Sequence, residues 1–408
     1  MTEQRDAGRA IRAYAAMRRE FVRRDGLYRR DGRPRLPGTA AHLWPTARAF
    51  VAAVDLLGLP ADLLSGCDAD AAVAAHLRAL EAYWDDPGGR FAAYASDVTG
   101  SRFGGDRYYD DNAWVGLGLV QLERLRPGRG HADRAAALFR FAAGGWDVRP
   151  DAPNPGGVFW VEQDRGIGMR NHDRNVVSNA PNAQLALHLA ELAELAELAG
   201  EAGLAELTGE ADDAEPEAEA DDVDQRAAGL RARALDMYAW VNATLDAGAA
   251  AGAPGTGLFF DKLRGDGTVD ETRWTYNQGS MVGVNVLLAR AALAVGSEEH
   301  GVYLSRAQAI GAKALRHYAD AYQRQPAAFN AILFRNLLQL HAATADDELR
   351  GAIRAAMAGY AEAAWARYRD RHDRFRFRPG GPTLLDQSAM VQIYALLARD
   401  PGDYGALA

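Results

Sequence analysis

The chain has 408 residues, and 48% of them are hydrophobic, so it can bury a large core. The formal net charge is -9 and no basic stripe occurs, which argues against nucleic acid as the main partner. The single cysteine, Cys67, excludes an internal disulfide bond and argues against a metal site built from cysteines.

The N-terminal residues carry no pattern typical of an export signal. They are polar from Met1 to Asp6, and no apolar segment follows them. We therefore expect no signal peptide, and no later apolar run reaches the length that spans a bilayer. If residue 1 is the native start, these features predict a cytoplasmic protein without a membrane partner.

Helix-like periodicity dominates the chain, whereas strand-like alternation is scarce. The periodicity and the capping signals predict twelve helices. We expect them to begin near Arg5, Thr39, Asp68, Asp111, His131, Ser178, Asp224, Asn277, Glu299, Pro326, Asp346 and Pro382.

The connections between these helices alternate in character. Those after even-numbered helices are short, whereas the long ones, roughly 26–38, 84–110, 144–177 and 247–276, follow odd-numbered helices and are rich in Gly, Trp, Tyr, Asn and Asp. If successive helices run antiparallel, all the long loops fall on one face. This pattern predicts an all-α fold, a single domain over 1–408 in which six helical hairpins form an (α/α)6 barrel. The even helices are the more apolar, so we expect them inside, with their N-termini at the active face.

Residues 209–224 form an acidic, low-complexity run between the sixth and seventh helices. We interpret the run as a solvated, mobile insertion, which would lie on the face opposite the long loops. A calcium loop would need a glycine and a ligand spacing that the run does not have.

Two consecutive carboxylates, Asp110 and Asp111, stand at a predicted helix start between Tyr108-Tyr109 and Asn112-Ala113-Trp114. One Asp would serve as a helix cap, but two are more than a cap needs. Because like charges this close push their pKa values apart, one carboxyl can stay protonated while the other is ionised. Cleavage of a glycosidic bond requires that division of roles. The alternative is an Asp cap followed by a solvated Asp.

The starts of the other predicted inner helices are also rich in polar and aromatic side chains. These residues are Trp44, Asn179, Asn182, Tyr276, Asn277, Gln278, Asn330, Asp386 and Gln387. Helix capping would explain most of the amides one at a time, but not the tryptophans and tyrosines beside them. Aromatic faces with amide and carboxylate groups suit sugar rings, which have apolar C–H faces and hydroxyl edges.

Other kinds of chemistry find little support in the sequence. The nine histidines have no metal-binding spacing, although His172 lies in a long loop and could touch a ligand. No nucleotide-binding glycine motif and no Gly-x-Ser-x-Gly elbow occur. We therefore expect no metal and no cofactor.

The segment from Tyr109 to Trp114 resembles the paired-aspartate motif of glycoside hydrolase family 76, the α-1,6-mannanases. The resemblance continues along the chain in the same order as in the family. Its further parts are Gly156-Gly157-Val158-Phe159-Trp160, Asn179-Ala180-Pro181-Asn182, Gly257-Leu258-Phe259-Phe260-Asp261 and Trp274-Thr275-Tyr276-Asn277-Gln278-Gly279. Together they cover roughly residues 84–340.

This resemblance implies an (α/α)6 barrel and retaining hydrolysis of α-mannosidic bonds, with the 1,6 linkage expected. By resemblance, Asp110 would be the nucleophile and Asp111 the general acid/base. The expected partner is an oligosaccharide or a small glycoside. Candidate substrate-binding residues are Trp44, Tyr108, Tyr109, Asn112, Trp160, Asn179, Asn182, Trp274, Tyr276, Asn277 and Gln278.

Two features depart from the family pattern. Many members are exported, whereas this chain shows no export signal, and Val115 stands where a second Trp often follows Trp114. Two alternatives stay open: a sugar epimerase or isomerase on the same barrel, and a non-catalytic carbohydrate-binding protein. An epimerase would use histidines as acid and base, and the expected inner helix starts carry none. A pure binder would not need two repelling carboxylates.

Overall fold

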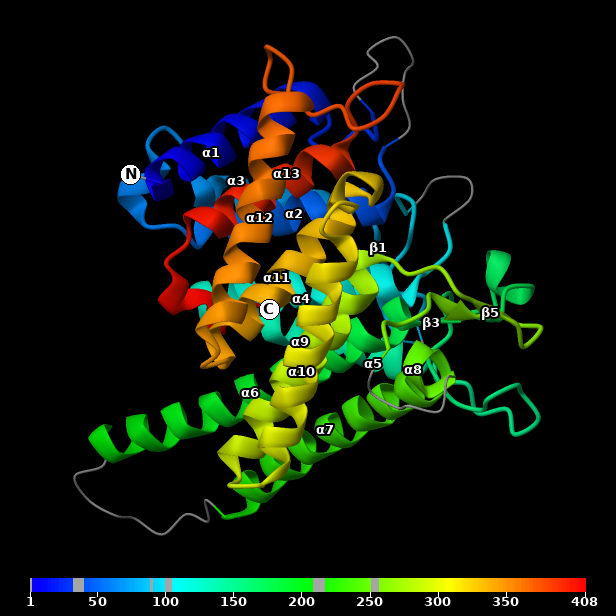
Figure 1. Cartoon of the computed structure of the whole chain (residues 1–408). Helices are drawn as coiled ribbons and strands as arrows, with labels where there is room; N and C mark the ends of the chain where they lie inside the picture. The colour runs from blue at the N-terminus through cyan, green and yellow to red at the C-terminus, as the bar shows by residue number, and fades with distance from the viewer. Residues whose placement is uncertain (1, 32–39, 89–90, 100–104, 208–216, 251–256) are drawn as a thin grey trace.

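The computed structural model describes residues 2–31, 40–88, 91–99, 105–207, 217–250 and 257–408, and in this part twelve long helices make up most of the chain (Figure 1). Six form an outer layer: α1 (Thr2–Phe21), α3 (Ala69–Glu81), α5 (His131–Ala143), α7 (Glu217–Leu245), α10 (Glu299–Tyr318) and α12 (Asp347–Arg367). Six form an inner layer: α2 (Leu43–Leu57), α4 (Tyr109–Leu125), α6 (Val176–Leu207), α9 (Thr275–Ala294), α11 (Ala327–Ala343) and α13 (Leu384–Ala398).

The inner helices close into a ring. Each contacts the next along the chain, and α13 contacts α2. In α2 and α13 nearly every side chain is buried, because these helices are covered on all sides by neighbours. The outer helices are amphipathic instead: α1 buries Ala10, Ala13, Tyr14 and Met17 on one stripe at a spacing of three or four residues. The predicted assembly of six helical hairpins is observed.

Small residues let the inner helices approach one another closely. A Cβ atom placed on Gly279 of α9 would lie 2.6 Å from the backbone Cα of Leu333 in α11. A side chain there would push the two helices apart, so the position needs glycine. The glycine of the Trp274–Gly279 segment thus has a packing role in the barrel wall.

Short strands tie the long loops together on one face of the barrel (Figure 1). In one pair, β1 (Trp84–Asp85) runs antiparallel to β2 (Ala93–Tyr94). In a three-stranded sheet, β4 (Lys262–Leu263) lies between β3 (Arg174–Asn175) and β5 (Val269–Asp270), again antiparallel. The remaining short elements are α8 (Ala247–Ala250) and four 3-10 turns at Ala61–Leu64, Gly166–Met169, Tyr322–Arg324 and Pro401–Ala406.

The predicted helix starts agree with the structure within a few residues, with one larger shift. Helix α7 begins at Glu217 rather than near Asp224, so the second half of the predicted insertion 209–224 is helical. Its alanines and glutamates are strong helix formers, which accounts for the shift. Residues 209–216 lie outside the described part of the chain. Within the described part, no helix is both long and apolar enough to cross a bilayer.

Candidate active site

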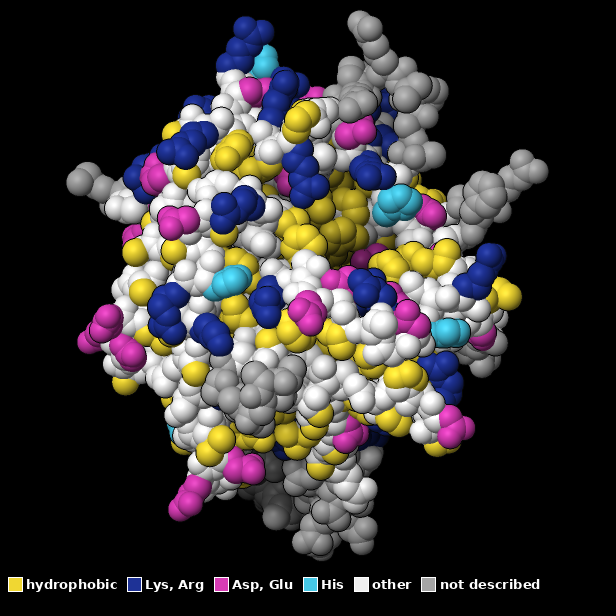
Figure 2. Space-filling view, turned by 45° about the vertical axis from the view of Figure 1, so that its right-hand side comes forward, with side chains coloured by type: hydrophobic (Ala, Val, Ile, Leu, Met, Phe, Trp, Pro, Cys, Tyr) yellow, Lys and Arg dark blue, Asp and Glu magenta, His cyan; other side chains and the backbone are white. Residues whose placement is uncertain are grey.

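A cavity of about 580 Å³ opens on the loop-bearing face, at the N-terminal ends of the inner helices. Its described walls are formed by Arg30, His42, Trp44, Pro45, Tyr108, Asp110, Asp111, Trp114, Trp160, Asn175, Val177, Asp261, Lys262, Tyr276, Pro326, Phe329, Arg378, Thr383, Leu385 and Asp386. Every one of the six inner helices contributes at least one of these side chains. Figure 2 shows the hollow with a hydrophobic floor, acidic groups within it and basic groups at its edge.

Asp110 and Asp111 occupy the second and third positions of α4, with Tyr108 at its N-cap. Backbone N–H groups are free in the first turn of a helix, and the carboxylate of Asp110 accepts its own N–H and that of Asp111. The side chain of Trp160 donates a further hydrogen bond to Asp110. One oxygen of Asp110, Oδ1, is buried and has no hydrogen-bond partner among the described residues.

The pKa values of both carboxyls are raised. Burial is the main cause for Asp110, and the charge of Asp261 adds to it, while the helix-start N–H groups and Trp160 work against the rise. Burial and the charge of Asp110 raise the pKa of Asp111 well above its ordinary value. Asp111 has no such opposing hydrogen bonds, so it is the carboxyl that keeps its proton more readily. The pair thus contains one group suited to be ionised and one suited to be protonated.

Aromatic rings form much of the cavity wall. Trp44 and Trp114 lie against each other with ring centroids 5.9 Å apart, and Tyr108 and Trp160 with centroids 4.8 Å apart. Tyr276 and Phe329 form a third pair on the cavity wall, with ring centroids 4.0 Å apart. Of the aromatic residues predicted to bind substrate, Trp44, Tyr108, Trp160 and Tyr276 therefore line the cavity.

Two other predicted aromatic residues do not line it. Tyr109 is buried beneath the helix start, where its ring stacks on Phe141 with centroids 4.5 Å apart. Trp274 lies at the N-cap of α9, with its ring edge-on to Phe329 at 5.5 Å. Trp274 thus packs on a side chain of the wall, Tyr109 packs on one outside it, and neither is proposed as a substrate contact.

The predicted amides lie beneath the cavity, where they hold the long loops against the helix starts. Asn112 accepts a hydrogen bond from the Tyr94 N–H at 2.8 Å and donates to the Tyr94 carbonyl at 3.0 Å. Asn179 makes the same pair of bonds to Val158, at 2.8 and 3.3 Å. Each amide thus acts toward one loop residue as a neighbouring strand would.

The other amides are used in the same way or in support of it. Gln278 accepts from the Phe259 N–H at 2.8 Å and donates to the Phe259 carbonyl at 2.9 Å. Asn182 donates to the Tyr109 carbonyl at 3.2 Å, and Asn277 donates to Asp261 at 3.1 Å. All five predicted amides are fully buried and line none of the cavity. We therefore leave them out of the proposed substrate contacts.

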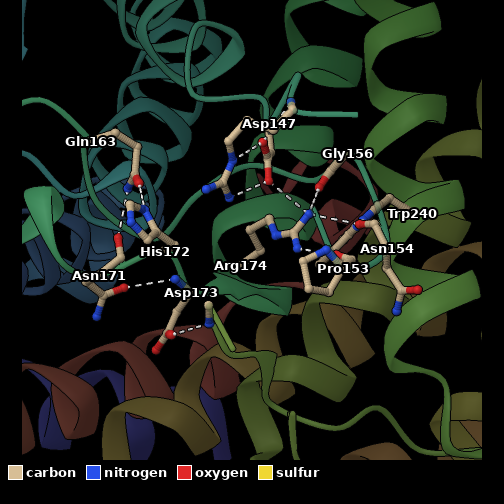
Figure 3. Close-up of polar contacts among 12 residues, drawn as sticks. Asp147, Pro153, Asn154, Gly156, Gln163, Asn171, His172, Asp173, Arg174 and Trp240 are labelled. Atoms are coloured by element: carbon tan, nitrogen blue, oxygen red, sulfur yellow. Dashed lines mark hydrogen bonds and ion pairs between the residues drawn. The ribbon is translucent and has the colours of Figure 1, made fainter. Parts of the chain in front are cut away.

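The loop that carries Trp160 is held by a buried arginine (Figure 3). Arg174 donates to the carbonyls of Asn154 at 2.8 Å and Gly156 at 2.7 Å, and it pairs with Asp147 at 3.1 Å. These charge-assisted bonds hold the backbone of the loop in one conformation. The predicted loop histidine, His172, lies beside Gln163 in the same loop and does not line the cavity.

The consecutive glycines of this loop are required by backbone geometry. Gly156 and Gly157 have φ angles of +96° and +80°, which side chains of L residues rarely permit. The ring of Trp240 lies so close that a Cβ on Gly157 would come within 2.6 Å of it. The turn brings Trp160 beside α4, where the Trp160 carbonyl accepts the Tyr109 N–H at 3.1 Å.

Several cavity residues are missing from the predicted catalytic and substrate-binding residues, although Asp386 was noted at its helix start. Asp261 is 8% exposed and Asp386 6%, and burial raises the pKa of each. The prediction that no inner helix begins at a histidine is wrong, because His42 forms the N-cap of α2. This helix begins at Leu43 and not near Thr39. Its Nδ1 lies 2.7 Å from a carboxylate oxygen of Asp97. Lys262 follows Asp261 and pairs with Asp173 at 2.8 Å.

A second cavity, of about 470 Å³, adjoins the first. The two share His42, Tyr108 and Asp111, so Asp111 lies at their junction. In the described part of the chain, no group of three or more histidine, cysteine or acidic side chains is arranged to hold a metal ion.

The C-terminal part of the chain also matches a model of a known family. The model of glycosyl hydrolase family 76 matches residues 229–396. The match confirms the resemblance to this family that the motifs carry. A comparison with curated proteins finds no match.

Solved structures share the fold of nearly the whole chain. A family 76 α-mannanase of Bacteroides thetaiotaomicron is 16% identical and has a TM-score of 0.72, with 97% of this chain and 95% of that one covered. An α-1,6-mannanase of Salegentibacter sp. HEL1_6 is 17% identical with a TM-score of 0.67, covering 96% and 99%. A D-mannose isomerase is 12% identical with a TM-score of 0.57, covering 96% of each chain. The predicted (α/α)6 barrel is confirmed.

Proposed function

We propose that the protein hydrolyses α-mannosidic bonds, 1,6-linked ones in particular, with retention of configuration, and that Asp110 and Asp111 carry the reaction. The observation that carries the proposal is the pair of carboxyls in the cavity, both with raised pKa values and with different hydrogen bonding. A retaining glycosidase needs one ionised and one protonated carboxyl.

The solved relatives support the same proposal. The Salegentibacter α-1,6-mannanase is described as inactive when two consecutive aspartates are changed to asparagines, and its structure holds α-1,6-mannotriose. This chain has two consecutive aspartates at the start of an inner helix of the same fold. We take them as the equivalent pair on that basis.

In the first step, a carboxylate oxygen of Asp110 attacks the anomeric carbon of the bound mannoside. The bond from that carbon to the leaving oxygen breaks, and Asp111 gives its proton to the leaving oxygen. The N–H groups of the first turn and Trp160 favour the ionised form of Asp110, while burial and the charge of Asp110 favour the protonated form of Asp111. The product of this step is a mannosyl ester of Asp110 and a free alcohol.

In the second step, Asp111 is ionised and takes a proton from a water molecule. The oxygen of that water attacks the anomeric carbon and displaces the carboxylate of Asp110. Asp111 regains its proton and Asp110 its charge. Two displacements at one carbon return the α configuration, so the first sugar product would be the α anomer.

The two cavities suit a substrate with sugar units on both sides of the bond that breaks. The proton donor of a retaining enzyme faces the leaving oxygen, and Asp111 lies where the cavities join. The aromatic first cavity would hold the sugar that is attacked, and the second would hold the leaving unit. The rings of Trp44, Tyr108, Trp160 and Tyr276 are positioned to contact the C–H faces of sugars.

A time course on reducing-end-labelled α-1,6-mannooligosaccharides tests the proposal. The wild type should release labelled fragments, and Asp111→Asn should lower the rate by about 10²–10⁴-fold because general acid catalysis is lost. Asp133→Asn is a matched control, since Asp133 lies in the first turn of the outer helix α5 and is exposed. Equal rates for wild type and Asp111→Asn would rule out Asp111 as the acid.

A sugar isomerase is the second candidate, and His42 is the observation that favours it. His42 lines the cavity, pairs with Asp97 and could move a proton between adjacent carbons of a sugar. Incubation with free mannose, followed by chromatography, tests this candidate. Conversion to a ketose without any cleavage of mannosides would replace the glycosidase proposal, and tight sugar binding without turnover would favour a binding protein.

A further inference from the structure

Asp261, like Asp386, is a buried carboxylate of the cavity wall, and the two-carboxylate mechanism does not use it. It lies at the end of the loop before β4 and lines the same cavity as Asp110 and Asp111. A buried acid costs free energy unless its oxygens receive hydrogen bonds, so its presence on the cavity wall needs an explanation.

The two oxygens of Asp261 have different surroundings. Oδ1 accepts a hydrogen bond from the Tyr276 hydroxyl at 3.2 Å and another from Asn277 Nδ2 at 3.1 Å. Oδ2 takes no hydrogen bond from the described residues, and it does not belong to the atoms sealed away from solvent. One oxygen is therefore anchored by the protein and the other is open to the cavity.

The backbone around Asp261 is held as firmly as the side chain. Its carbonyl accepts the Val176 N–H at 3.0 Å, and its N–H donates to the Asp270 carbonyl at 2.9 Å. The side chain of Gln278 binds the backbone N–H and the carbonyl of Phe259, which stands two residues before Asp261. These bonds join Asp261 to α6, β5 and α9, so its position is fixed before a ligand arrives.

We infer that Asp261 Oδ2 accepts a hydrogen bond from a ring hydroxyl of the sugar bound at the reacting position. An ionised carboxylate can only accept, and sugar hydroxyls are the donors that a glycoside would bring to this wall. Asp261 lies close enough to Asp110 for its charge to raise the pKa of Asp110. Both carboxylates also line one cavity, so we place the hydroxyl that Asp261 binds on the sugar that Asp110 attacks. This inference rests on the proposed glycosidase function.

The test pairs a variant with substrates that lack one hydroxyl. We would measure kcat/KM on an aryl α-mannoside and on its 2-, 3-, 4- and 6-deoxy analogues, for wild type and for Asp261→Asn. Removing the hydroxyl that Asp261 binds should cost the wild type about 10- to 100-fold, as expected for a hydrogen bond to a charged group. The same removal should cost Asp261→Asn much less, whereas the other deoxy penalties should stay unchanged.

Controls separate this contact from a structural role. Asp266→Asn is matched, because Asp266 lies in the turn between β4 and β5, is exposed and does not line the cavity; it should keep the full deoxy penalties. A second readout is the acidic limb of the pH profile. Removal of the Asp261 charge should move that limb to lower pH, since the charge raises the pKa of Asp110.

The outcomes distinguish this inference from the proposed function. If the wild type cleaves the mannoside and Asp261→Asn shows the same deoxy penalties, Asp261 does not bind a hydroxyl and the inference is overturned. If the wild type cleaves no mannoside at all, the proposed function fails and the inference fails with it. An Asp261→Asn protein with an altered melting temperature is replaced by Asp261→Ser, judged by the same comparison.

Discussion

Asn112 binds both backbone groups of Tyr94: its Oδ1 accepts the Tyr94 N–H at 2.8 Å and its Nδ2 donates to the Tyr94 carbonyl at 3.0 Å. The side chain of the residue after the Asp110-Asp111 pair thereby fastens the loop strand β2 to the start of α4. Asn179 and Gln278 repeat this arrangement at the starts of α6 and α9. The loops that shape the cavity are held by the helices that carry the reacting groups.

Asn112→Ala should lower the free energy of unfolding by about 3 kcal/mol, because two buried hydrogen bonds are lost and two backbone groups are left without partners. Urea unfolding followed by circular dichroism would measure it. Gln308→Ala is the control: Gln308 makes one side-chain bond on the outer helix α10 and should cost about 1 kcal/mol or less. Equal losses for the two variants would contradict the role given to Asn112.

Asp111→Asn should raise the melting temperature above that of the wild type at pH 8. The gain should be smaller at pH 4. The pKa of Asp111 is raised on folding, so its contribution to stability is present below the ordinary pKa of an aspartate and is lost as pH rises toward the folded value. Asparagine carries no such penalty. Melting temperatures at both pH values would measure the difference, and a gap that shrinks with rising pH would contradict it.

Trp160→Phe should move the acidic limb of kcat/KM to higher pH. The hydrogen bond from Trp160 lowers the pKa of Asp110, and phenylalanine keeps an aromatic ring without the N–H. A pH profile on an aryl α-mannoside would show the shift. Trp44→Phe is the matched control on the same cavity wall, and a limb that moves equally in both variants would argue against a specific bond to Asp110.

Gly157→Ala should destabilise the protein by roughly 2–4 kcal/mol, because φ is +80° and the Trp240 ring occupies the space of a Cβ. Gly229→Ala provides the contrast. Gly229 lies inside α7 with nothing within 4 Å of a new Cβ, so alanine should stabilise by about 0.5–1 kcal/mol. Thermal unfolding of both variants would test the pair, and effects of the same sign would contradict this explanation.

The barrel could be predicted from the sequence because its signals are local. Caps and apolar periodicity mark each helix, as where Asp68 accepts the Ala71 N–H at the start of α3. The alternation of short and long connections then places the loops on one face. His42 shows the limit of this reasoning: a helix start displaced by a few residues moved a histidine into the cavity.

The site could be predicted only in part, because sequence does not state which way a side chain points. Asn112 and Trp114 both follow the aspartate pair, yet Asn112 turns to a loop and Trp114 to the cavity. Amides at helix starts were assigned to substrate, whereas the loops need their hydrogen bonds for buried backbone groups. Asp261 lies in a long loop without periodicity, and only the folded sheet brings it to the wall.

The measurement that tests the central claim most directly is a proton NMR time course of α-1,6-mannotetraose with the wild-type protein. The account predicts that the α anomer of the shorter product forms first and that the β anomer follows only by mutarotation, because Asp110 and then water attack the same carbon. Prior formation of the β anomer would contradict the retaining mechanism and the role of Asp110 as nucleophile.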